Sequence, residues 1–281
     1  MATAPALQAT VIIPANDEAA FIGPCLKDVL ASSDTVPFEV IVVANGCTDA
    51  TASIACDIAH GAKNPARPVQ VIETPSGGKP GALQLGDAAA QGATRIYLDA
   101  DVRVGPGLIP ALIAALDTGP PRYASGRPRV APAQSRVTRL YARFWQSLPF
   151  FSTGVPGFGL FAMNGSGRAR WGSWPDIISD DTFARLNFAP DERIQVPHSY
   201  SWPMIEGLAG LIRVRRRQDR GVREIARHFP GLLRNADPDG RAGRHKARAA
   251  LHDPAGFLVY AAVALATRWP ARGSTGWERG R

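Results

Sequence analysis

Strand-like and helix-like segments alternate along the first hundred residues of the chain. Apolar strand patterns occur at Ala9 to Pro14, Phe38 to Val43, Val69 to Ile72 and Arg95 to Leu98. Helical patterns lie between them, at Asp17 to Ala31, Asp49 to His60 and Gly78 to Gln91. Repeated strand-helix units with short connections predict an α/β fold, with a mostly parallel central sheet and helices on both of its faces. Ligands of such sheets bind outside the carboxyl ends of the strands.

Length and cysteine content limit the classes of protein. A chain of 281 residues can bury a sizeable core. The three cysteines, at positions 25, 47 and 56, are too few and too scattered for a disulfide framework or a zinc site, so a reducing, cytoplasmic setting is expected. No apolar stretch has the length of a membrane span, and residues 1–8 lack a signal-peptide pattern. We therefore expect a cytoplasmic protein, or one lying peripherally on the cytoplasmic face of a membrane.

Two carboxylates, Asp99 and Asp101, directly follow the fourth strand pattern. Residues i and i+2 of an extended chain point to the same side, so the two side chains can converge beyond the strand. Carboxylates held together repel unless a cation separates them. A divalent Mg²⁺ or Mn²⁺ ion, completed by phosphate oxygens of a substrate, is the simplest candidate. The alternative is that Asp99 caps the following helix and Asp101 is a solvated loop residue.

Polar segments follow the other three strand patterns as well. They are Pro14-Ala15-Asn16-Asp17-Glu18, Ala44-Asn45-Gly46-Cys47-Thr48-Asp49 and Pro75-Ser76-Gly77-Gly78-Lys79-Pro80-Gly81. Each one alone is explained by helix caps or turns. Together they place carboxylates, amides and one lysine at the rim of a single sheet, which indicates a binding site.

The order of these motifs resembles that of the inverting family 2 glycosyltransferases, which have the GT-A fold and use nucleotide-sugar donors. The resemblance covers residues 9–117 closely. It implies that Asp99 and Asp101 bracket the ribose and hold the metal on the diphosphate, and that Lys79 approaches the base or the phosphates. The other positions implied to border the nucleotide are Pro14, Ala15, Glu18 and Asn45. Many relatives have an acidic pair where this chain has Ala44-Asn45, so the identity of the base stays open; an asparagine amide can still pair with a base edge.

The pair Asp180-Asp181 provides candidates for the catalytic base. At a helix start, one residue can cap the helix while the other faces a cleft. The pair resembles the Glu-Asp motif whose second residue is the general base in inverting enzymes, so Asp181 is expected in that role with Asp180 as runner-up. Inversion requires a base on the acceptor hydroxyl, while the metal and nearby cations absorb the charge of the departing nucleotide diphosphate. A doubly acidic helix start without a catalytic role is the alternative.

Positive charge is concentrated in one segment. Residues 212–248 hold twelve Lys and Arg against four acids, which accounts for the whole net charge of +8. Several processive relatives have Gln-x-x-Arg-Trp near this place, where this chain has Arg216-Arg217-Gln218-Asp219-Arg220-Gly221, so Arg217 or Arg220 is expected to bind the donor diphosphate. Attraction to anionic lipid, or to a lipid-diphosphate acceptor, is the competing interpretation. The apolar segment Ala255 to Thr267 is expected to be a packing helix or an interfacial segment.

The expected organisation is a glycosyltransferase domain at residues 1–203, with a nucleotide-sugar-binding half at 9–117 and an acceptor half at 118–203. A helical basic region follows at 204–269, and a disordered tail at 270–281. The acceptor is expected to carry a hydroxyl group on a glycan, a lipid-linked molecule or a small molecule.

Two other functions are weighed against this one. A nucleotidyltransferase would share the sheet, the metal and the lysine, but it usually has a basic, Gly-rich loop where this chain has Pro14 to Glu18. A non-enzymatic basic module would bind membrane or nucleic acid through residues 212–248 with steep salt dependence. That function leaves the first hundred residues unexplained, and nucleic acid is not an expected partner.

Overall fold

The computed structural model describes residues 6–32, 36–62, 64–237 and 242–268. The chain forms two compact units, each built from several segments. Unit 1 comprises Met1–Arg129, Gly157–Asp176 and Asn187–Trp202, and unit 2 comprises Val130–Pro156, Ile177–Leu186 and Pro203–Arg281. The predicted tail at 270–281 lies outside the described residues. The predicted boundary between residues 203 and 204 falls close to the last change of unit, whereas parts of the expected acceptor half belong to unit 2.

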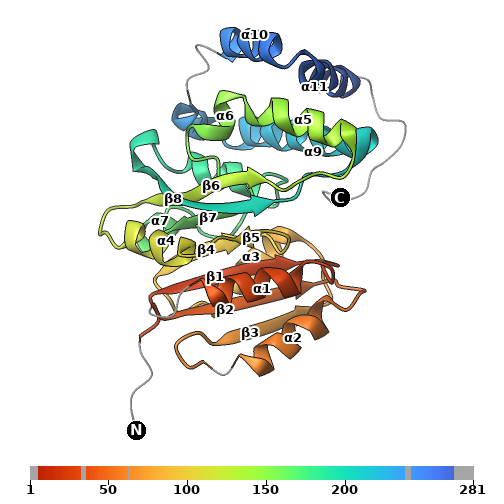
Figure 1. The fold of residues 1–281 in the computed structure, drawn as a ribbon. Coiled ribbons are helices and arrows are strands. Elements are labelled where there is room, and N and C mark those ends of the chain that lie inside the picture. The colour runs from red at the N-terminus through yellow and green to blue at the C-terminus, as the bar shows by residue number, and fades with distance from the viewer. Residues whose placement is uncertain (1–5, 33–35, 63, 238–241, 269–281) are drawn as a thin grey trace. The chain divides into compact units, whose positions relative to one another are not determined.

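Unit 1 is organised around one eight-stranded sheet (Figure 1). Its strands are β1 (Ala9–Ala15), β2 (Phe38–Asn45), β3 (Val69–Thr74), β4 (Thr94–Leu98), β5 (Arg103–Val104), β6 (Tyr123–Val130), β7 (Leu160–Met163) and β8 (Arg193–Trp202). They are arranged in the order β3-β2-β1-β4-β7-β6-β8-β5. Strands β3, β2, β1 and β4 pair in parallel, while β7 is antiparallel to β4 and to β6. The predicted α/β fold is confirmed, and the parallel part of the sheet coincides with the four strands expected from the sequence.

The register brings the carboxyl ends of the parallel strands to one edge of the sheet. Ala15 of β1 lies opposite Ala44 of β2, and Asn45 lies opposite Thr74 of β3. Leu98, the last residue of β4, pairs with Leu160 of β7. Every polar segment singled out from the sequence therefore starts at this edge, which we call the carboxyl edge.

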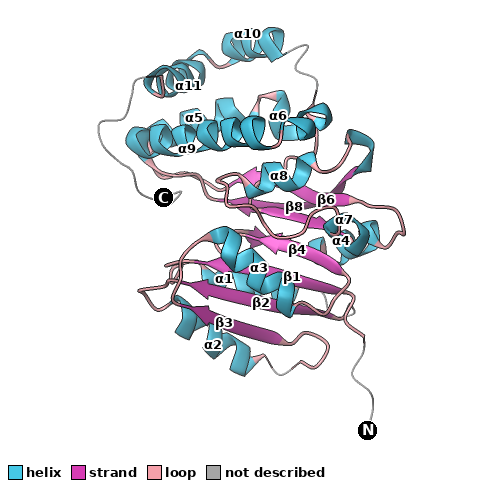
Figure 2. Cartoon of the chain, turned by 180° about the vertical axis from the view of Figure 1, so that it is seen from behind, coloured by secondary structure: helices cyan, strands magenta, loops and turns pink. Residues whose placement is uncertain are grey.

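Helices cover the sheet of unit 1 on both sides (Figure 2). They are α1 (Ile22–Ala31), α2 (Thr51–Gly61), α3 (Lys79–Ala89), α4 (Leu108–Leu116) and α7 (Gly165–Arg168), with a short 3-10 turn at Pro190–Glu192. The main core contains Val11 and Ile13 of β1, Val40 and Val42 of β2, and apolar residues of α1 and α4. Side chains of alternate residues on each strand face opposite helices, which explains why all eight residues of β2 are buried.

One acid lies inside this apolar sheet. Glu39 of β2 is 4% exposed, and its Oε1 accepts hydrogen bonds from Thr10 Oγ1 at 2.6 Å and from Gly92 N at 3.2 Å. A buried carboxylate is tolerated when hydrogen bonds replace its hydration. Glu39 therefore connects β2 to the turn that leads into β4.

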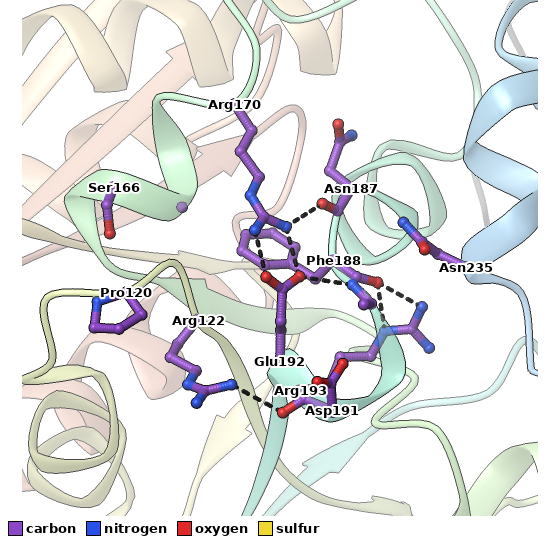
Figure 3. A network of polar contacts seen from close by, with 12 residues as sticks. Pro120, Arg122, Ser166, Arg170, Asn187, Phe188, Asp191, Glu192, Arg193 and Asn235 are labelled. Carbon is purple, nitrogen blue, oxygen red and sulfur yellow. Dashed lines mark hydrogen bonds and ion pairs between the residues drawn. The ribbon is translucent and has the colours of Figure 1, made fainter.

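The opposite edge of the sheet is closed by a polar network (Figure 3). Arg170 forms a two-pronged ion pair with Glu192, with N–O distances of 2.7 and 2.5 Å, and its guanidinium lies 4.7 Å from the ring centre of Phe188. Buried Arg193 donates to the carbonyl of Phe188, and Arg122 donates to the carbonyl of Asp191 at 2.9 Å. These contacts join the starts of β6 and β8 to the chain beyond α7. Their donors and acceptors are matched to each other, so this edge is stabilised without a ligand.

Unit 2 is a helical assembly. Its helices are α5 (Arg136–Gln146), α6 (Pro149–Ser152), α8 (Asp180–Leu186), α9 (Gly207–His228), α10 (Ala242–His252) and α11 (Pro254–Ala266), with a 3-10 helix at Pro230–Asn235. Helix α11 packs against α5 and α9, and α10 packs against α11. Aromatic residues of α5 take part in this packing, since Phe144 is buried and its ring lies 5.1 Å from that of Tyr260 of α11. Within the described part of the chain, no helix has the length and hydropathy that a membrane crossing requires.

Candidate functional site

An ion pair between Lys79 and Asp99 stands at the carboxyl edge of unit 1. Lys79 is the first residue of α3, and its Nζ lies 2.7 Å from Oδ1 of Asp99, which directly follows β4. Both side chains are partly exposed, at 25% and 36%. The structure therefore brings together two residues that the sequence separates by twenty positions, and leaves both accessible to a ligand.

Asp101 follows in the same turn and is half-buried. The turn closes when Val102 N donates to the carbonyl of Asp99 at 3.1 Å. Beneath it lies the fully buried Cys25 of α1, whose Sγ is 3.9 Å from that carbonyl oxygen. Burial raises the pKa of the Cys25 thiol, and the charges of Asp101, Asp28 and Asp99 raise it further. Cys25 is therefore an uncharged, buried side chain beneath the acidic turn rather than a reactive thiol.

The glycine that precedes β7 supports the acidic turn. Gly159 has φ of +67°, and its carbonyl accepts a hydrogen bond from Asp99 N at 2.8 Å. A Cβ at this position would lie 2.8 Å from Cγ2 of Val102 and 3.6 Å from Oδ2 of Asp99. Both the left-handed backbone and the lack of space require glycine here. The close neighbour of Gly159 is therefore the acidic turn.

Asn45 connects two loops of the carboxyl edge. Its side chain is buried, at 3% exposure; Nδ2 donates to the carbonyl of Ala15 at 2.9 Å, and Oδ1 accepts from Gly78 N at 3.0 Å. These bonds hold the end of β1 and the residue preceding Lys79. A direct contact of Asn45 with a base stays a prediction, whereas its placement of the loop before α3 is visible in the structure.

The segment after β1 forms a tight loop. Pro14 is half-buried, Ala15 is 1% exposed, and Glu18 is half-buried with its backbone N donating to Thr51 Oγ1 at 2.6 Å. Asp17 has φ of +52°, so the helix predicted from this residue begins only at Ile22. The predicted donor residues Pro14, Ala15 and Glu18 thus lie at the carboxyl edge, as the strand register requires.

Asp17, Cys47 and Asp49 form a second acidic cluster at this edge. Their potential ligand atoms lie within 4.8 Å of one another. However, Asp17 Oδ1 accepts from Thr48 N at 2.6 Å, and Asp49 Oδ2 accepts from Ala19 N at 3.1 Å. Backbone donors thus already bind both carboxylates, and a thiol suits Mg²⁺ or Mn²⁺ poorly. These contacts fit a clamp between the first two loops better than a metal site.

Asp180 and Asp181 begin α8 in unit 2. Asp180 is 5% exposed, while Asp181 is half-buried. Asp181 Oδ1 accepts from the backbone N of Thr182 at 2.6 Å. Asp181 is therefore the more exposed of the pair, and its role as the catalytic base stays a prediction.

Helix α9 positions the segment that leads into α8. The carboxylate of Glu224 accepts from Ile178 N at 3.0 Å, and a Cβ on Gly221 would lie 2.1 Å from Ser179 Oγ. Arg217 is one helical turn before Gly221, on the same face of α9. The structure therefore brings the face that carries Arg217 towards the chain just before Asp180. Neither Gly221 nor Glu224 was singled out from the sequence, although a glycine inside a helical pattern signals close packing.

The arginines of α9 divide between inward and outward positions. Arg215 contacts Asp219 at 3.0 Å and lies over the ring of Tyr260, and Arg216 donates to the carbonyl of Ala266 at 2.9 Å. Arg217 is half-buried and Arg220 is exposed. Part of the basic segment thus stabilises the packing of α9 on α11, which leaves Arg217 and Arg220 as candidates for binding an anion.

Asp87 of α3 is a buried hub that sequence reasoning missed. Its side chain is 8% exposed and accepts from Tyr97 Oη at 2.7 Å, Arg168 Nε at 2.8 Å and Trp174 Nε1 at 2.7 Å. Arg168 in turn lies over the rings of Trp171 and Trp174. Trp174 is therefore fixed against α3, the helix whose first residue is Lys79.

The fold resembles those of solved glycosyltransferases. A mannosyltransferase from Pyrobaculum calidifontis in complex with GDP-Man and Mn²⁺ matches with a TM-score of 0.60 and 22% identity, over 93% of this chain and 75% of that chain. Glucosyl-3-phosphoglycerate synthase from Mycobacterium tuberculosis, in complex with Mn²⁺, UDP and glucosyl-3-phosphoglycerate, matches with a TM-score of 0.54 and 23% identity, over 83% of this chain and 82% of that chain. These likenesses show that the fold is of the GT-A type.

Sequence comparison gives a narrower match. The dolichyl-phosphate beta-glucosyltransferase of Drosophila melanogaster is 34% identical over 105 residues, which are 34% of this chain and 32% of that protein. The chain thus matches about a third of the length of this curated relative. The family model described as glycosyl transferase family 2 matches residues 10–173, more than half of the chain. That range runs from β1 to Ser173 and includes the Lys79–Asp99 pair, so the chain belongs to glycosyl transferase family 2.

Proposed function

We propose that this protein transfers a sugar from a nucleotide-diphosphate sugar to an acceptor hydroxyl, with inversion at the sugar carbon. The observation that carries the proposal is the Lys79–Asp99 pair, with an Nζ–Oδ1 distance of 2.7 Å, in a family 2 chain. A lysine and two aspartates at the carboxyl edge of an α/β sheet can bind the ribose and diphosphate of a donor.

The donor side of the proposal rests on unit 1. Asp99 and Asp101 bind the ribose and the metal, and Lys79 binds the phosphates or the base. Pro14, Ala15 and Glu18 border the nucleotide, and Asn45 acts through the loop whose Gly78 N it binds at 3.0 Å. GDP and UDP, the nucleotides of the two solved relatives, are the first candidates.

A divalent metal fits the acidic turn by the chemistry of its donors. Asp99 and Asp101 offer hard carboxylate oxygens, which Mn²⁺ and Mg²⁺ prefer. Such an ion, when bound, would offset negative charge on the diphosphate. Solved relatives contain Mn²⁺ or Mg²⁺. Lys79 then supplies a second positive charge from the N-terminus of α3.

The catalytic base is assigned to unit 2. Asp181 removes the proton of the acceptor hydroxyl as the oxygen attacks the sugar carbon, and the bond from that carbon to the nucleotide diphosphate breaks. Asp180 is the second candidate, but its 5% exposure favours a structural role. Arg217 or Arg220 binds the diphosphate and stabilises its charge as it leaves.

The acceptor is proposed to carry a phosphate group in addition to the oxygen that attacks the sugar, which is a hydroxyl or an equivalent oxygen. Two relatives support this proposal: a dolichyl-phosphate glucosyltransferase and a glucosyl-3-phosphoglycerate synthase. Polyprenyl phosphate and 3-phosphoglycerate are therefore the two acceptors to test first. Family membership favours transfer over the nucleotidyltransferase and the non-enzymatic basic module.

Two variants test the assignment. Asp101→Ala should abolish the metal-dependent thermal stabilisation by a nucleoside diphosphate, because a ligand bound only to the folded state must raise the melting temperature. Asp181→Ala should keep that stabilisation and lose transfer, with kcat falling by about 10²- to 10⁴-fold.

The matched control is Asp57→Ala, on the exposed side of α2. This variant should retain both donor binding and transfer. Full turnover by Asp101→Ala and by Asp181→Ala would refute the site. Loss of donor binding in Asp181→Ala would assign that residue to the donor instead of the acceptor.

A further inference from the structure

Helix α11 is apolar on its exposed side as well as on its packed side. No charged residue lies between Pro254 and Ala266. On the packed side, Val263 is fully buried and Tyr260 stacks on Tyr141 with 5.7 Å between ring centres. On the opposite side, Leu258 is 68% exposed and Leu265 is 51% exposed. A helix at the surface of a globular unit normally presents polar residues to water.

A further exposed leucine lies on α10. Leu251, near the end of α10, is 83% exposed, and the three leucines recur at intervals of seven residues. Ala262 is also exposed on this side of α11. We name Leu251, Leu258, Ala262 and Leu265 the leucine face. Grouped exposed apolar side chains of this kind mark a surface that binds a partner.

The charges around the leucine face are positive. Lys246 and Arg248 of α10 are exposed, and so is Arg268, which follows α11. The acid in this part of the chain, Asp253, forms an ion pair with Arg143 at 2.5 Å and has a side chain only 17% exposed. A partner of the leucine face therefore meets apolar side chains bordered by cations at both ends.

We propose that the leucine face docks on the surface of an anionic lipid bilayer. Leucine side chains in the boundary between headgroups and acyl chains remove apolar area from water, while Lys246, Arg248 and Arg268 lie among the lipid phosphates. The helices rest on the surface rather than crossing it. The sequence-based expectation of lipid binding rested on charge in residues 212–248, which include Lys246 and Arg248; the apolar leucine face was not part of it.

A second copy of the chain explains the face less well. In a twofold contact through the leucine face, the cations of one copy would come close to the identical cations of the other. Like charges at a contact weaken association, whereas an anionic surface is attracted. Charge complementarity therefore selects the lipid surface.

Vesicle flotation of the full chain tests the proposal without donor or acceptor. The wild type should float with phosphatidylcholine vesicles enriched in phosphatidylglycerol, and less with phosphatidylcholine alone. Leu258→Glu/Leu265→Glu should weaken binding to the anionic vesicles by about tenfold or more, because the apolar area no longer enters the interface. Lys246→Gln/Arg248→Gln should weaken it by about 25-fold, at about fivefold for each cation.

The matched control is Val222→Glu, a site on α9 that is 55% exposed. It should bind vesicles like the wild type, and thermal melting should show that every variant is folded. The proposal is wrong if the wild type does not float, if the double leucine variant floats unchanged, or if Val222→Glu weakens binding equally. A dimer in sedimentation velocity that the leucine substitutions dissociate would identify a second copy as the occupant.

Vesicle binding and sugar transfer are read out separately. The leucine variants should keep transfer to a water-soluble acceptor, since the leucine face holds none of the residues assigned to the reaction. A wild-type protein that transfers sugar but does not bind anionic vesicles would refute the lipid proposal alone. Vesicle binding by a protein without transfer activity would leave the lipid proposal standing and refute the proposed function.

Discussion

Lys79 and a divalent metal are the two cations that we assign to the acidic turn. Replacing Lys79 with methionine tests their contributions separately. The substitution keeps most of the length of the side chain and removes its charge. Lys79 Nζ and Asp99 Oδ1 are 2.7 Å apart, and the side chains are 25% and 36% exposed. Partly exposed ion pairs contribute about 0.2 to 1 kcal/mol. Lys79→Met should therefore lower the melting temperature by no more than about 4 °C.

Binding of metal and of nucleotide should change in opposite directions in Lys79→Met. With Asp99 released from the ion pair, Mn²⁺ alone should bind about 1.4- to 5-fold more tightly, which corresponds to the same 0.2 to 1 kcal/mol. A nucleoside diphosphate should bind more weakly, because a charge-assisted hydrogen bond to phosphate is worth about 1.5 to 3 kcal/mol. That loss corresponds to about 10- to 150-fold in Kd.

Isothermal titration calorimetry measures both affinities on the same protein. The control is Lys27→Met, which removes an exposed lysine from α1 and should change neither affinity. Weaker Mn²⁺ binding by Lys79→Met would refute the idea that Lys79 and the metal compete for Asp99. Unchanged nucleotide affinity would show that Lys79 does not contact the donor.

Two further predictions concern unit 2 and the polar network at the opposite edge of the sheet. Gly221→Ala places a Cβ 2.1 Å from Ser179 Oγ, so it should lower the free energy of unfolding by about 1 to 3 kcal/mol and lower kcat by displacing the start of α8. The control is Gly231→Ala, where nothing lies within 4 Å of the added Cβ. Equal kcat values in the two variants would contradict the reasoning. The hydrogen bond from Arg170 lowers the pKa of Glu192 below its ordinary value of 4.5. The ionised Glu192 therefore contributes its full share of the free energy of unfolding above pH 4.5, and this share is lost as the pH falls through the lowered pKa. Thermal unfolding should therefore show a smaller loss of stability on acidification for Glu192→Gln than for the wild type, and identical acid profiles would exclude this contribution.

The parallel half of the sheet could be predicted because its pattern is local. Each strand is a short apolar run and each helix a periodic one, so the order of elements follows from neighbouring residues. Val69–Thr74 and Lys79–Ala89 lie within two residues of the predicted segments. The start of α1 at Ile22 instead of Asp17 was missed, since the positive φ of Asp17 depends on the clamp to Thr48 from another loop.

The site was only partly predictable, because some of its contacts join segments that are distant in the sequence. Asp99 and Lys79 were singled out because each follows a strand, and their pairing follows from the parallel register. The supporting groups depend on contacts between distant segments: Gly159 closes on the turn of Asp99, and Asn45 binds Gly78 N. A single asparagine after a strand signals a turn, and nothing in its neighbours reveals that its amide will hold another loop.

The roles of the arginines in the basic segment depend on how α9 packs against α11. The sequence concentrates arginines in α9, but which of them face inward depends on α11, whose Tyr260 and Ala266 lie 45 and 50 residues after Arg215 and Arg216. Tyr260 and the carbonyl of Ala266, both on α11, bind Arg215 and Arg216. The same packing that uses these arginines turns Leu258 and Leu265 towards solvent. The inward arginines and the outward leucines are therefore two results of one helix contact, which is why we place lipid binding on the leucine face and reserve Arg217 and Arg220 for the donor.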